Sequence, residues 1–375
     1  NISAFPAGRA EHSAVYIASN KKLYILGGLD SSGNASSNQL FYIDASEAFT
    51  ISIPSIKWVD LSSTVGITNR SSATACDDSN TIFYIGGVHR GGLVSRFDTL
   101  SRTWSEPATS GSIPAEVLTY TQCVTLGHKI YIHGGLSSYK INILDSSQLS
   151  WSSFSSPLMY SGTQGYSATL LNDLILYIGG GFDSVNVCEY NSNNKQTYGN
   201  APSAKCGHSS VYIPQQKNRI LLFYGSNDIS INSLNTLTFN WTIPVISGNG
   251  GPKQSLMQHT STLVGAYVFI VFGYYPNYTI SSDVFALDVS NNDNYKWVTA
   301  YDPVNSITPI PTPTVSSTPS STSTTSTSNT NIGAIIGGVI GGIAGLILLS
   351  CTAIIIILIV KKKYLDNDNI AIPEN

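Results

Sequence analysis

The stretch KLYILGG, residues 22–28, decides the fold because its pattern returns along the chain. Close copies are TIFYIGG (81–87), KIYIHGG (129–135) and LILYIGG (174–180), and shorter copies are ILLFYG (220–225) and VFIVFG (268–273). Each copy is a run of aliphatic and aromatic residues with high β propensity that ends at glycine. The final glycines recur every 45 to 59 residues. Self-similarity of this kind predicts a repeat protein built from short strands.

Two further landmarks follow each glycine. An Asp or Asn ends a later strand, and a large aromatic residue comes after it: Asp44, Asp98, Asp145, Asn191, Asn235 and Asp288, then Trp58, Trp104, Trp151, Tyr198, Trp241 and Trp297. Another short strand precedes each glycine run, which makes four strands per repeat and six repeats. A four-stranded sheet repeated around an axis is a propeller blade. We therefore predict an all-β, six-bladed β-propeller over residues 1–302. How the ring closes is left open, and residues 2–5 could add to an outer edge.

Diglycine at the end of the second strand, then Asp, then Trp about six residues later resembles the kelch repeat. The resemblance covers about residues 9–302, although two copies lose one glycine and Tyr198 replaces Trp in the fourth. With the C-terminal features described below, the layout is similar to membrane-anchored kelch and galactose-oxidase-like propeller proteins of fungal type. The resemblance implies a kelch-type propeller in which each Trp packs against the neighbouring blade.

The resemblance also raises an oxidase alternative, because galactose oxidase binds copper through ligands that include an adjacent Tyr-His pair. This chain has six histidines, and none follows a tyrosine. No metal-ligand spacing such as H-x-H is present either. We therefore expect no catalytic residues, no metal and no cofactor. A carbohydrate oxidase-like enzyme of the secretory pathway stays as the alternative.

Three histidines occupy the same repeat position, at the start of the innermost strand: His12, His208 and His259. They fall in repeats one, five and six, which are neighbours in a closed ring. We expect them side by side near one mouth of the central channel, either as a ligand site or bonded locally to backbone.

The loops between second and third strands form a second candidate site, because loops on a rigid scaffold carry binding residues. The candidates are His89 and Arg90 in one loop, and Tyr274, Tyr275 and Tyr278 in another. The tyrosines could stack on sugars, anchor a protein partner, or pack on their own loop.

Four cysteines precede the C-terminal region: Cys76, Cys123, Cys188 and Cys206. Four cysteines allow three pairings, and the sequence leaves them open. Buried free thiols are an alternative for Cys76 and Cys123.

The C-terminal region divides into three segments. Residues 303–331 are dominated by Pro, Ser and Thr, which is typical of a disordered, O-glycosylated stalk or of a plain linker. Residues 332–360 contain no charge and no proline, which predicts a transmembrane helix. Lys361, Lys362 and Lys363 follow at once and mark residues 361–375 as a cytoplasmic tail.

This order predicts a single-pass type I protein of the plasma membrane with an extracellular propeller. The start at Asn1 is consistent with signal-peptide removal. A cytosolic, tail-anchored kelch adaptor is the competing topology.

Two sets of positions could be modified or paired. Candidate N-glycosylation sites are Asn1, Asn34, Asn69, Asn240 and Asn277, although a chain this rich in Ser and Thr has such sites by chance. In the predicted membrane helix, small residues recur every four positions: Gly333, Gly337, Gly341 and Gly345. This spacing lets two helices approach closely and predicts a possible homodimer.

Only 11% of residues are charged and the net charge is −3, so no basic footprint for nucleic acid is present. We expect a non-enzymatic recognition or adhesion module at the cell surface. Its partner would be a protein or a cell-wall carbohydrate.

Overall fold

The computed structural model describes residues 6–305, apart from 34–38, 53–54, 64–68, 90, 136–139, 156–163, 172, 181–186, 190–193, 196, 204, 216–217, 227 and 292–293. The chain divides into a compact unit, Asn1–Ile310, and a second unit, Pro311–Asn375. The predicted stalk from residue 306, the transmembrane helix at 332–360 and the tail lie outside the described residues. Among the helices that the structure does describe, none is long and apolar enough to cross a membrane.

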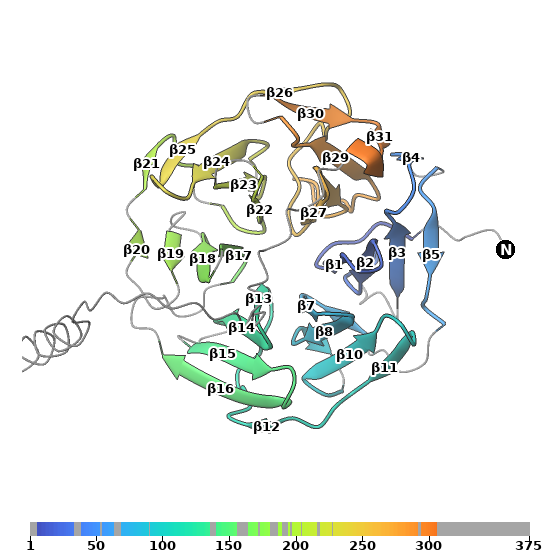
Figure 1. Cartoon of the computed structure of the whole chain (residues 1–375), viewed down its shortest axis with the longest axis vertical. Helices are drawn as coiled ribbons and strands as arrows, with labels where there is room; N and C mark the ends of the chain where they lie inside the picture. The colour runs from blue at the N-terminus through green and yellow to red at the C-terminus, as the bar shows by residue number, and fades with distance from the viewer. Residues whose placement is uncertain are drawn as a thin grey trace, which may run out of the picture. The chain divides into compact units, whose positions relative to one another are not determined.

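Six sheets of four or five strands make up the first unit (Figure 1). In chain order, from the innermost strand outward, they are β1, β2, β3, β5 (Ser13–Ile17, Lys22–Leu26, Leu40–Asp44, Trp58–Asp60); β7, β8, β10, β11 (Thr74–Asp78, Thr81–Ile85, Val94–Asp98, Thr103–Ser105); β13, β14, β15, β16, β12 (Cys123–Leu126, Lys129–His133, Lys140–Asp145, Ser150–Ser155, Ser110–Gly111); β17, β18, β19, β20 (Ser167–Leu171, Leu174–Ile178, Val187–Glu189, Asn194–Lys195); β22, β23, β24, β25, β21 (Ser209–Ile213, Arg219–Phe223, Ile231–Asn235, Asn240–Thr242, Tyr198–Gly199); and β27, β28, β29, β30, β26 (Thr260–Val264, Tyr267–Val271, Val284–Asp288, Tyr295–Val298, Ile246–Ser247).

The sheets stand around a central axis, so the predicted all-β β-propeller is confirmed (Figure 1). The innermost strands contact one another in the closed order β1, β7, β13, β17, β22, β27 and back to β1. Five of these sheets are described with the side chains of all their strands. In the fourth, the side chains of β19 and β20 lie outside the described residues.

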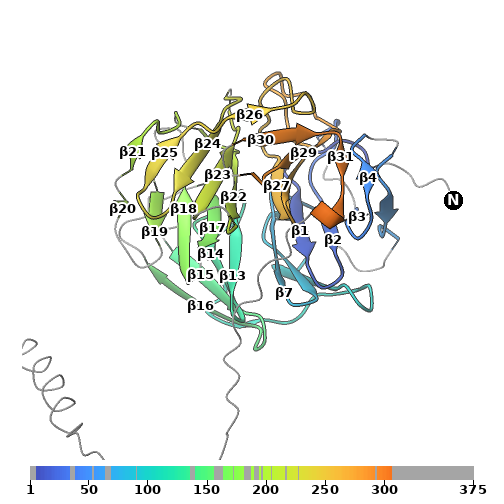
Figure 2. The same cartoon turned by 45° about the horizontal axis from the view of Figure 1, so that its top comes forward.

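Two short sheets and one helical turn complete the unit. β31 (Ala300–Tyr301) pairs with β4 (Phe49–Thr50), and the two lie side by side in the tilted view (Figure 2). β6 (Arg70–Ser71) pairs with β9 (Val88–His89), and a 3-10 helix covers Pro303–Asn305. The β31–β4 pair joins the end of the propeller to its first repeat, which answers the closure question that the sequence left open.

Hydrophobic clusters lie between neighbouring sheets, as a propeller requires. Trp104 packs among residues of the first sheet, including Tyr24 and Tyr42, and Trp58 stacks on Phe272 of the sixth with ring centroids 5.9 Å apart. Trp151 and Trp241 are buried in the same way against the preceding sheet. The aromatic residues of the repeat therefore hold adjacent sheets together.

One landmark was assigned to the wrong repeat. The repeat pattern predicts Tyr198 as the outer aromatic of the fourth repeat, but it lies in β21, which pairs in parallel with β25 of the fifth sheet. Its side chain is 55% exposed. It belongs to the segment between the two sheets, which adds an outermost strand to the sheet that follows.

Steric crowding explains why the repeats carry glycine at the end of the second strand. Gly27 has φ +60°, and a Cβ there would lie 2.4 Å from the Arg70 carbonyl oxygen of the next sheet. Gly179 has φ +71°, and a Cβ there would lie 2.6 Å from the His208 ring. Only glycine combines this backbone with so close a neighbour.

Candidate functional site

A closed ring of backbone hydrogen bonds surrounds one mouth of the central channel. Each N–H donates to the carbonyl of the equivalent residue in the preceding sheet: Glu11 to Gln258 (3.1 Å), Ser72 to Glu11 (2.9 Å), Tyr120 to Ser72 (2.9 Å), Gly165 to Tyr120 (2.9 Å), Gly207 to Gly165 (3.2 Å) and Gln258 to Gly207 (2.8 Å). Each of the six residues lies just before an innermost strand. We call them the mouth ring.

Every member of the mouth ring has a left-handed backbone, with φ between 51° and 68°. Glycine adopts this conformation readily, whereas other residues lose roughly 1–2 kcal/mol in it. Gly165 and Gly207 fit the position. Glu11, Ser72, Tyr120 and Gln258 occupy it against this preference, and strained positions of this kind concentrate at functional sites.

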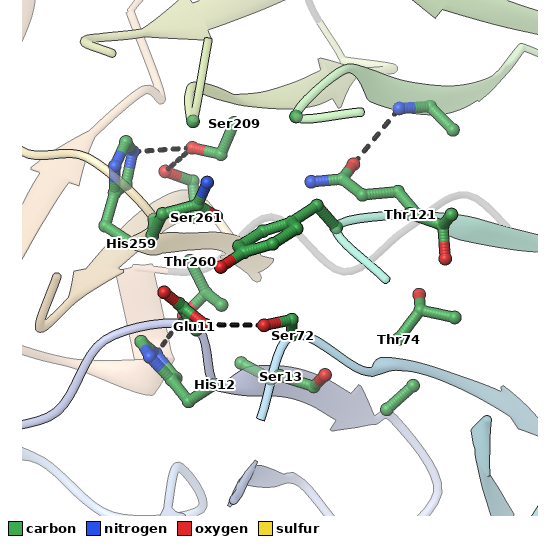
Figure 3. Close-up of a pocket in the computed structure, with 18 of the residues that line it drawn as sticks. Glu11, His12, Ser13, Ser72, Thr74, Thr121, Ser209, His259, Thr260 and Ser261 are labelled. Carbon is green, nitrogen blue, oxygen red and sulfur yellow. Dashed lines mark hydrogen bonds between the residues drawn. The ribbon is translucent and has the colours of Figure 1, made fainter. Parts of the chain in front are cut away.

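The mouth ring opens onto a cavity of about 220 Å³ inside the propeller (Figure 3). The innermost strands of all six sheets contribute to its lining, largely with Ser, Thr and Gln side chains. Ser209 Oγ donates to Ser261 Oγ at 2.6 Å, so part of this hydroxyl lining is bonded to itself. The cavity is therefore polar and suits a ligand that forms hydrogen bonds.

Glu11 reaches the middle of this view, where its carboxylate accepts a hydrogen bond from the Ser72 hydroxyl (Figure 3). Two tyrosines lie close to it. Burial raises the pKa of Tyr274 to about 12, and the Glu11 charge adds to the rise. Burial and the same charge also raise the pKa of Tyr120. The hydroxyls of Tyr120 and Tyr274 therefore stay protonated beside a carboxylate at neutral pH.

The three candidate histidines line this same cavity, as expected, but each ring is bonded to the preceding sheet. His12 Nε2 is 2.9 Å from Thr260 Oγ1, His208 Nε2 is 3.0 Å from the Ile178 carbonyl oxygen, and His259 Nε2 is 2.7 Å from Ser209 Oγ. Each contact joins neighbouring sheets; only the His208 contact is to backbone, and none of the three is local in the sequence. In the described part of the chain, no group of three or more His, Cys, Asp or Glu could hold a metal ion.

Burial also keeps these histidines neutral. It lowers the pKa of His208 to about 4 and that of His259 to about 3. The pKa of His12 is well below its usual value, first because of burial and then because of the Arg9 charge. The histidines therefore add no positive charge to the cavity at neutral pH.

The tyrosine loop divides into packed and exposed residues. The Tyr275 hydroxyl donates to Asp283 Oδ2 at 2.6 Å, so this side chain packs on its own loop. Tyr278 is 76% exposed, and its ring meets that of Tyr274 edge-on with centroids 6.5 Å apart. In the other loop, the His89 backbone pairs with Arg70, its side chain is not among those described, and Arg90 lies outside the described residues.

Sequence reasoning missed the buried basic residues that fix these loops. Arg70 is fully buried, and its guanidinium donates to the Gly86, Gly92 and Leu93 carbonyls and to Ser95 Oγ. Arg9 and Lys205 occupy the equivalent position, and Lys205 Nζ lies 2.7 Å from Asp228 Oδ2. The sequence signal that could have revealed them is a basic residue at the same repeat position, two residues before the mouth ring.

A disulfide joins Cys76 of β7 to Cys123 of β13, with Cα atoms 6.1 Å apart. It links the innermost strands of the second and third sheets beside the cavity. The alternative of two buried free thiols is therefore wrong. Cys206 is free, and the Cys188 side chain and Cys351 are not among those described.

The candidate modification sites are only partly described. Asn277 is exposed on the tyrosine loop, where its Oδ1 accepts hydrogen bonds from Thr279, and Asn240 is half-buried in β25. Asn69 is exposed, whereas Asn1 and Asn34 lie outside the described residues. The same holds for the glycines of the predicted membrane helix: Gly333, Gly337, Gly341 and Gly345.

Comparison with known proteins supports the repeat assignment. Residues 2–181 match the KLHDC2/KLHL20/DRC7 Kelch-repeats domain. The chain is 24% identical over 208 residues to kelch domain-containing protein 3 of Homo sapiens, covering 46% of this chain and 50% of that protein. It is 27% identical over 166 residues to the Rab9 effector protein with kelch motifs of Mus musculus, covering 39% and 40%. The chain thus spans half or less of the curated relatives it matches.

A solved structure shares the fold. The protein titled "Structure of YjhT" aligns with a TM-score of 0.62 at 14% identity, over 79% of this chain and 99% of that one. The sheet arrangement, the diglycine repeats and the match over residues 2–181 agree. The first unit of this chain is therefore a β-propeller that contains a kelch-repeat domain.

Proposed function

We propose that this chain is a non-enzymatic interaction protein whose mouth ring and adjoining loops bind a protein partner. The observation that carries the proposal is the mouth ring itself. Four non-glycine side chains are kept in left-handed conformations around the entrance of a polar cavity, although two equivalent positions carry glycine. Nine other described non-glycine residues have positive φ elsewhere in the propeller, so what distinguishes these four is that they surround the entrance of the cavity.

The kelch-repeat relatives are consistent with this role. One of them is described as an effector protein of Rab9, and kelch-repeat proteins of this group act as interaction or adaptor proteins rather than enzymes. The relatives reported above are mammalian, and neither is described as an oxidase, so the oxidase alternative gains no support from them.

Site-specific photocrosslinking tests the proposal. A photoreactive phenylalanine analogue replaces Tyr278, which is 76% exposed beside the mouth ring, or Leu237, which is 72% exposed in the β24–β25 turn at the opposite end of the sheets. In cells that make the chain, we expect a discrete crosslinked protein from position 278 and none from 237. Equal products from both positions would contradict a partner at the mouth.

We infer that each of the six larger sheets acts as one blade. The closed cycle of six inner strands and the six hydrogen bonds of the mouth ring support this count. A cryo-electron microscopy map with a different number of four-stranded units around the axis would overturn it.

We also propose that the propeller faces an oxidising compartment, anchored by residues 332–360. The Cys76–Cys123 disulfide supports this, because disulfides persist outside the cytosol. The uncharged run followed by three lysines supports the type I topology. A glycosidase-sensitive mass shift of the expressed chain is the expected result. An unglycosylated chain with reduced cysteines would favour the cytosolic adaptor.

Pairing through the membrane helix stays a prediction of the glycine spacing. A membrane-association reporter should give a weaker signal for Gly337→Ile and Gly341→Ile than for the native span. Equal signals would exclude this route to a homodimer.

A further inference from the structure

The described lining of the central cavity carries a single negative charge. Among the described residues that line it, Glu11 is the one Asp, Glu, Lys or Arg. The lining histidines, His12, His208 and His259, are neutral at pH 7 because burial lowers the pKa of each ring. The mouth therefore presents an isolated carboxylate within polar but uncharged walls.

Nothing among the described residues neutralises this carboxylate. Its hydrogen bonds come from the uncharged hydroxyls of Ser72, Tyr120 and Tyr274, and no described side chain forms an ion pair with it. Arg9 is two residues away, but its guanidinium donates to the Ala7 and Gly27 carbonyls and to Gln39. Arg9 also stacks over Phe41 at 5.2 Å, so its guanidinium contacts neutral groups rather than Glu11.

The groups beside Glu11 suit a positively charged ligand. Tyr120 lines the cavity, and Tyr274 lies close enough for the Glu11 charge to raise the pKa of its hydroxyl. Aromatic faces attract ammonium and guanidinium groups, and a carboxylate binds them through charge-assisted hydrogen bonds. Gln258 adds an amide at the next ring position.

The size of the cavity limits what can enter. At about 220 Å³ it is smaller than the roughly 300–1,000 Å³ of a site for a drug-sized molecule. It suits one extended side chain rather than a helix or a folded domain. A partner protein would insert a single residue and rest its remaining surface on the loops around the mouth.

We propose that the mouth ring binds the side chain of a lysine or arginine from a protein partner, with Glu11 as the anchoring group. This inference rests on the proposed function, since it names the chemistry by which the partner is recognised. The left-handed backbone at Glu11 supports it, because the carboxylate is kept at a position where glycine fits better.

Ligand-observed saturation-transfer NMR on the full chain tests the inference. The probes are the Nα-acetyl methylamides of lysine and arginine, and their neutral counterparts are those of norleucine and citrulline. Each probe is used at about 10 mM, so that binding with a millimolar dissociation constant is detected. The variants are Glu11→Gln, which keeps an oxygen for the Ser72 bond, and the control Glu47→Gln, which removes an exposed glutamate paired with Lys57.

We expect saturation transfer to the lysine and arginine probes from the native chain and from Glu47→Gln. Glu11→Gln should reduce it about tenfold, since a charge-assisted hydrogen bond is lost. Equal transfer to cationic and neutral probes, no transfer to the cations, or an undiminished signal from Glu11→Gln would overturn the inference. If Glu11→Gln does not fold, the comparison of cationic with neutral probes on the native chain still tests whether the cavity prefers a positive charge.

The two proposals fail in different ways. A specific crosslink at position 278 without preference for cationic probes would refute the role of Glu11 and leave the protein partner standing. A cation preference without any crosslink at that position would refute the protein partner.

Discussion

At the scale of single residues, the mouth ring allows glycine and a larger residue to be compared at the same backbone position. Gln258 (φ 51°) and Gly207 (φ 66°) hold the same left-handed position in neighbouring sheets. Gln258→Gly should raise the free energy of unfolding by about 1 kcal/mol, because it relieves a backbone that disfavours side chains. Gly207→Ala should lower it by a similar amount, since its Cβ would also meet the Gln258 nitrogen at 3.2 Å. Urea unfolding measures both, and a loss of stability in Gln258→Gly or a gain in Gly207→Ala would contradict the strain argument.

The buried histidines make stability depend on pH. In the unfolded chain a histidine titrates near pH 6.5, whereas burial lowers the folded pKa of His208 to about 4 and of His259 to about 3. The unfolded state therefore binds the proton first. Their contribution is complete above about pH 6.5 and is lost as pH falls, by up to about 1.4 kcal/mol per pH unit for each ring.

The measurement is urea unfolding of the native chain and of His259→Gln at pH 7.5, 6.5, 5.5 and 4.5. The variant should show the shallower loss of stability across this range. Carboxylates that titrate at low pH affect both proteins equally, so the difference isolates His259. Parallel curves would mean that this ring is already charged or exposed in the folded chain.

Glu11 illustrates what the sequence could not reveal about the site. The shared position of His12, His208 and His259 was visible in the repeats, and their place around one cavity followed from it. Their hydrogen-bond partners were not visible, because each lies on the preceding sheet about 30 to 248 positions away. No sequence pattern marked Glu11, and it is the left-handed backbone that aligns it with Gly165 and Gly207.

At the scale of elements, the repeats located most strands. KLYILGG became β2 (Lys22–Leu26) followed by two glycines of positive φ, and its three close copies did the same. In the two shorter copies, Tyr224 and Phe272 take the place of the first glycine and also have positive φ. The outermost parallel strands β12, β21 and β26 escaped prediction. Each has two residues and pairs with a strand at least 40 residues away, so no local pattern marks it. For this reason Tyr198 was placed in the wrong repeat.

The disulfide between β7 and β13 is an element-scale connection with a measurable contribution. Cys76 and Cys123 are 47 residues apart in sequence. Replacing both with serine should lower the free energy of unfolding by about 2–4 kcal/mol, because the unfolded chain gains freedom. Cys206→Ser is the matched control, since Cys206 is free. Equal loss in both variants, or no Cys76–Cys123 peptide in a non-reducing digest, would refute the bridge.

At the scale of the whole molecule, residues at both ends of the propeller close the ring. The Tyr301 side chain is buried, and its hydroxyl donates to the Ala45 carbonyl at 3.0 Å. Its ring packs on Phe49 and Tyr267 with centroids 5.0 and 5.2 Å away. These contacts join the end of the last repeat to the first repeat.

Tyr301→Ala should therefore destabilise the entire propeller, by about 3–5 kcal/mol, as expected for removal of a buried aromatic ring. Leu237→Ala is the control, because Leu237 is 72% exposed and its loss should be nearly neutral. Thermal unfolding followed by far-ultraviolet circular dichroism compares the two. A Tyr301→Ala chain that melts like the native one would show that the ring does not need this contact.

The central claim is that a protein partner binds at the mouth ring, and hydrogen–deuterium exchange with the crosslinked partner tests it most directly. Peptides that contain Glu11, Gln258 and Tyr278 should exchange more slowly in the complex, whereas the β24–β25 turn around Leu237 should be unchanged. Protection at the turn with none at the mouth would contradict the account.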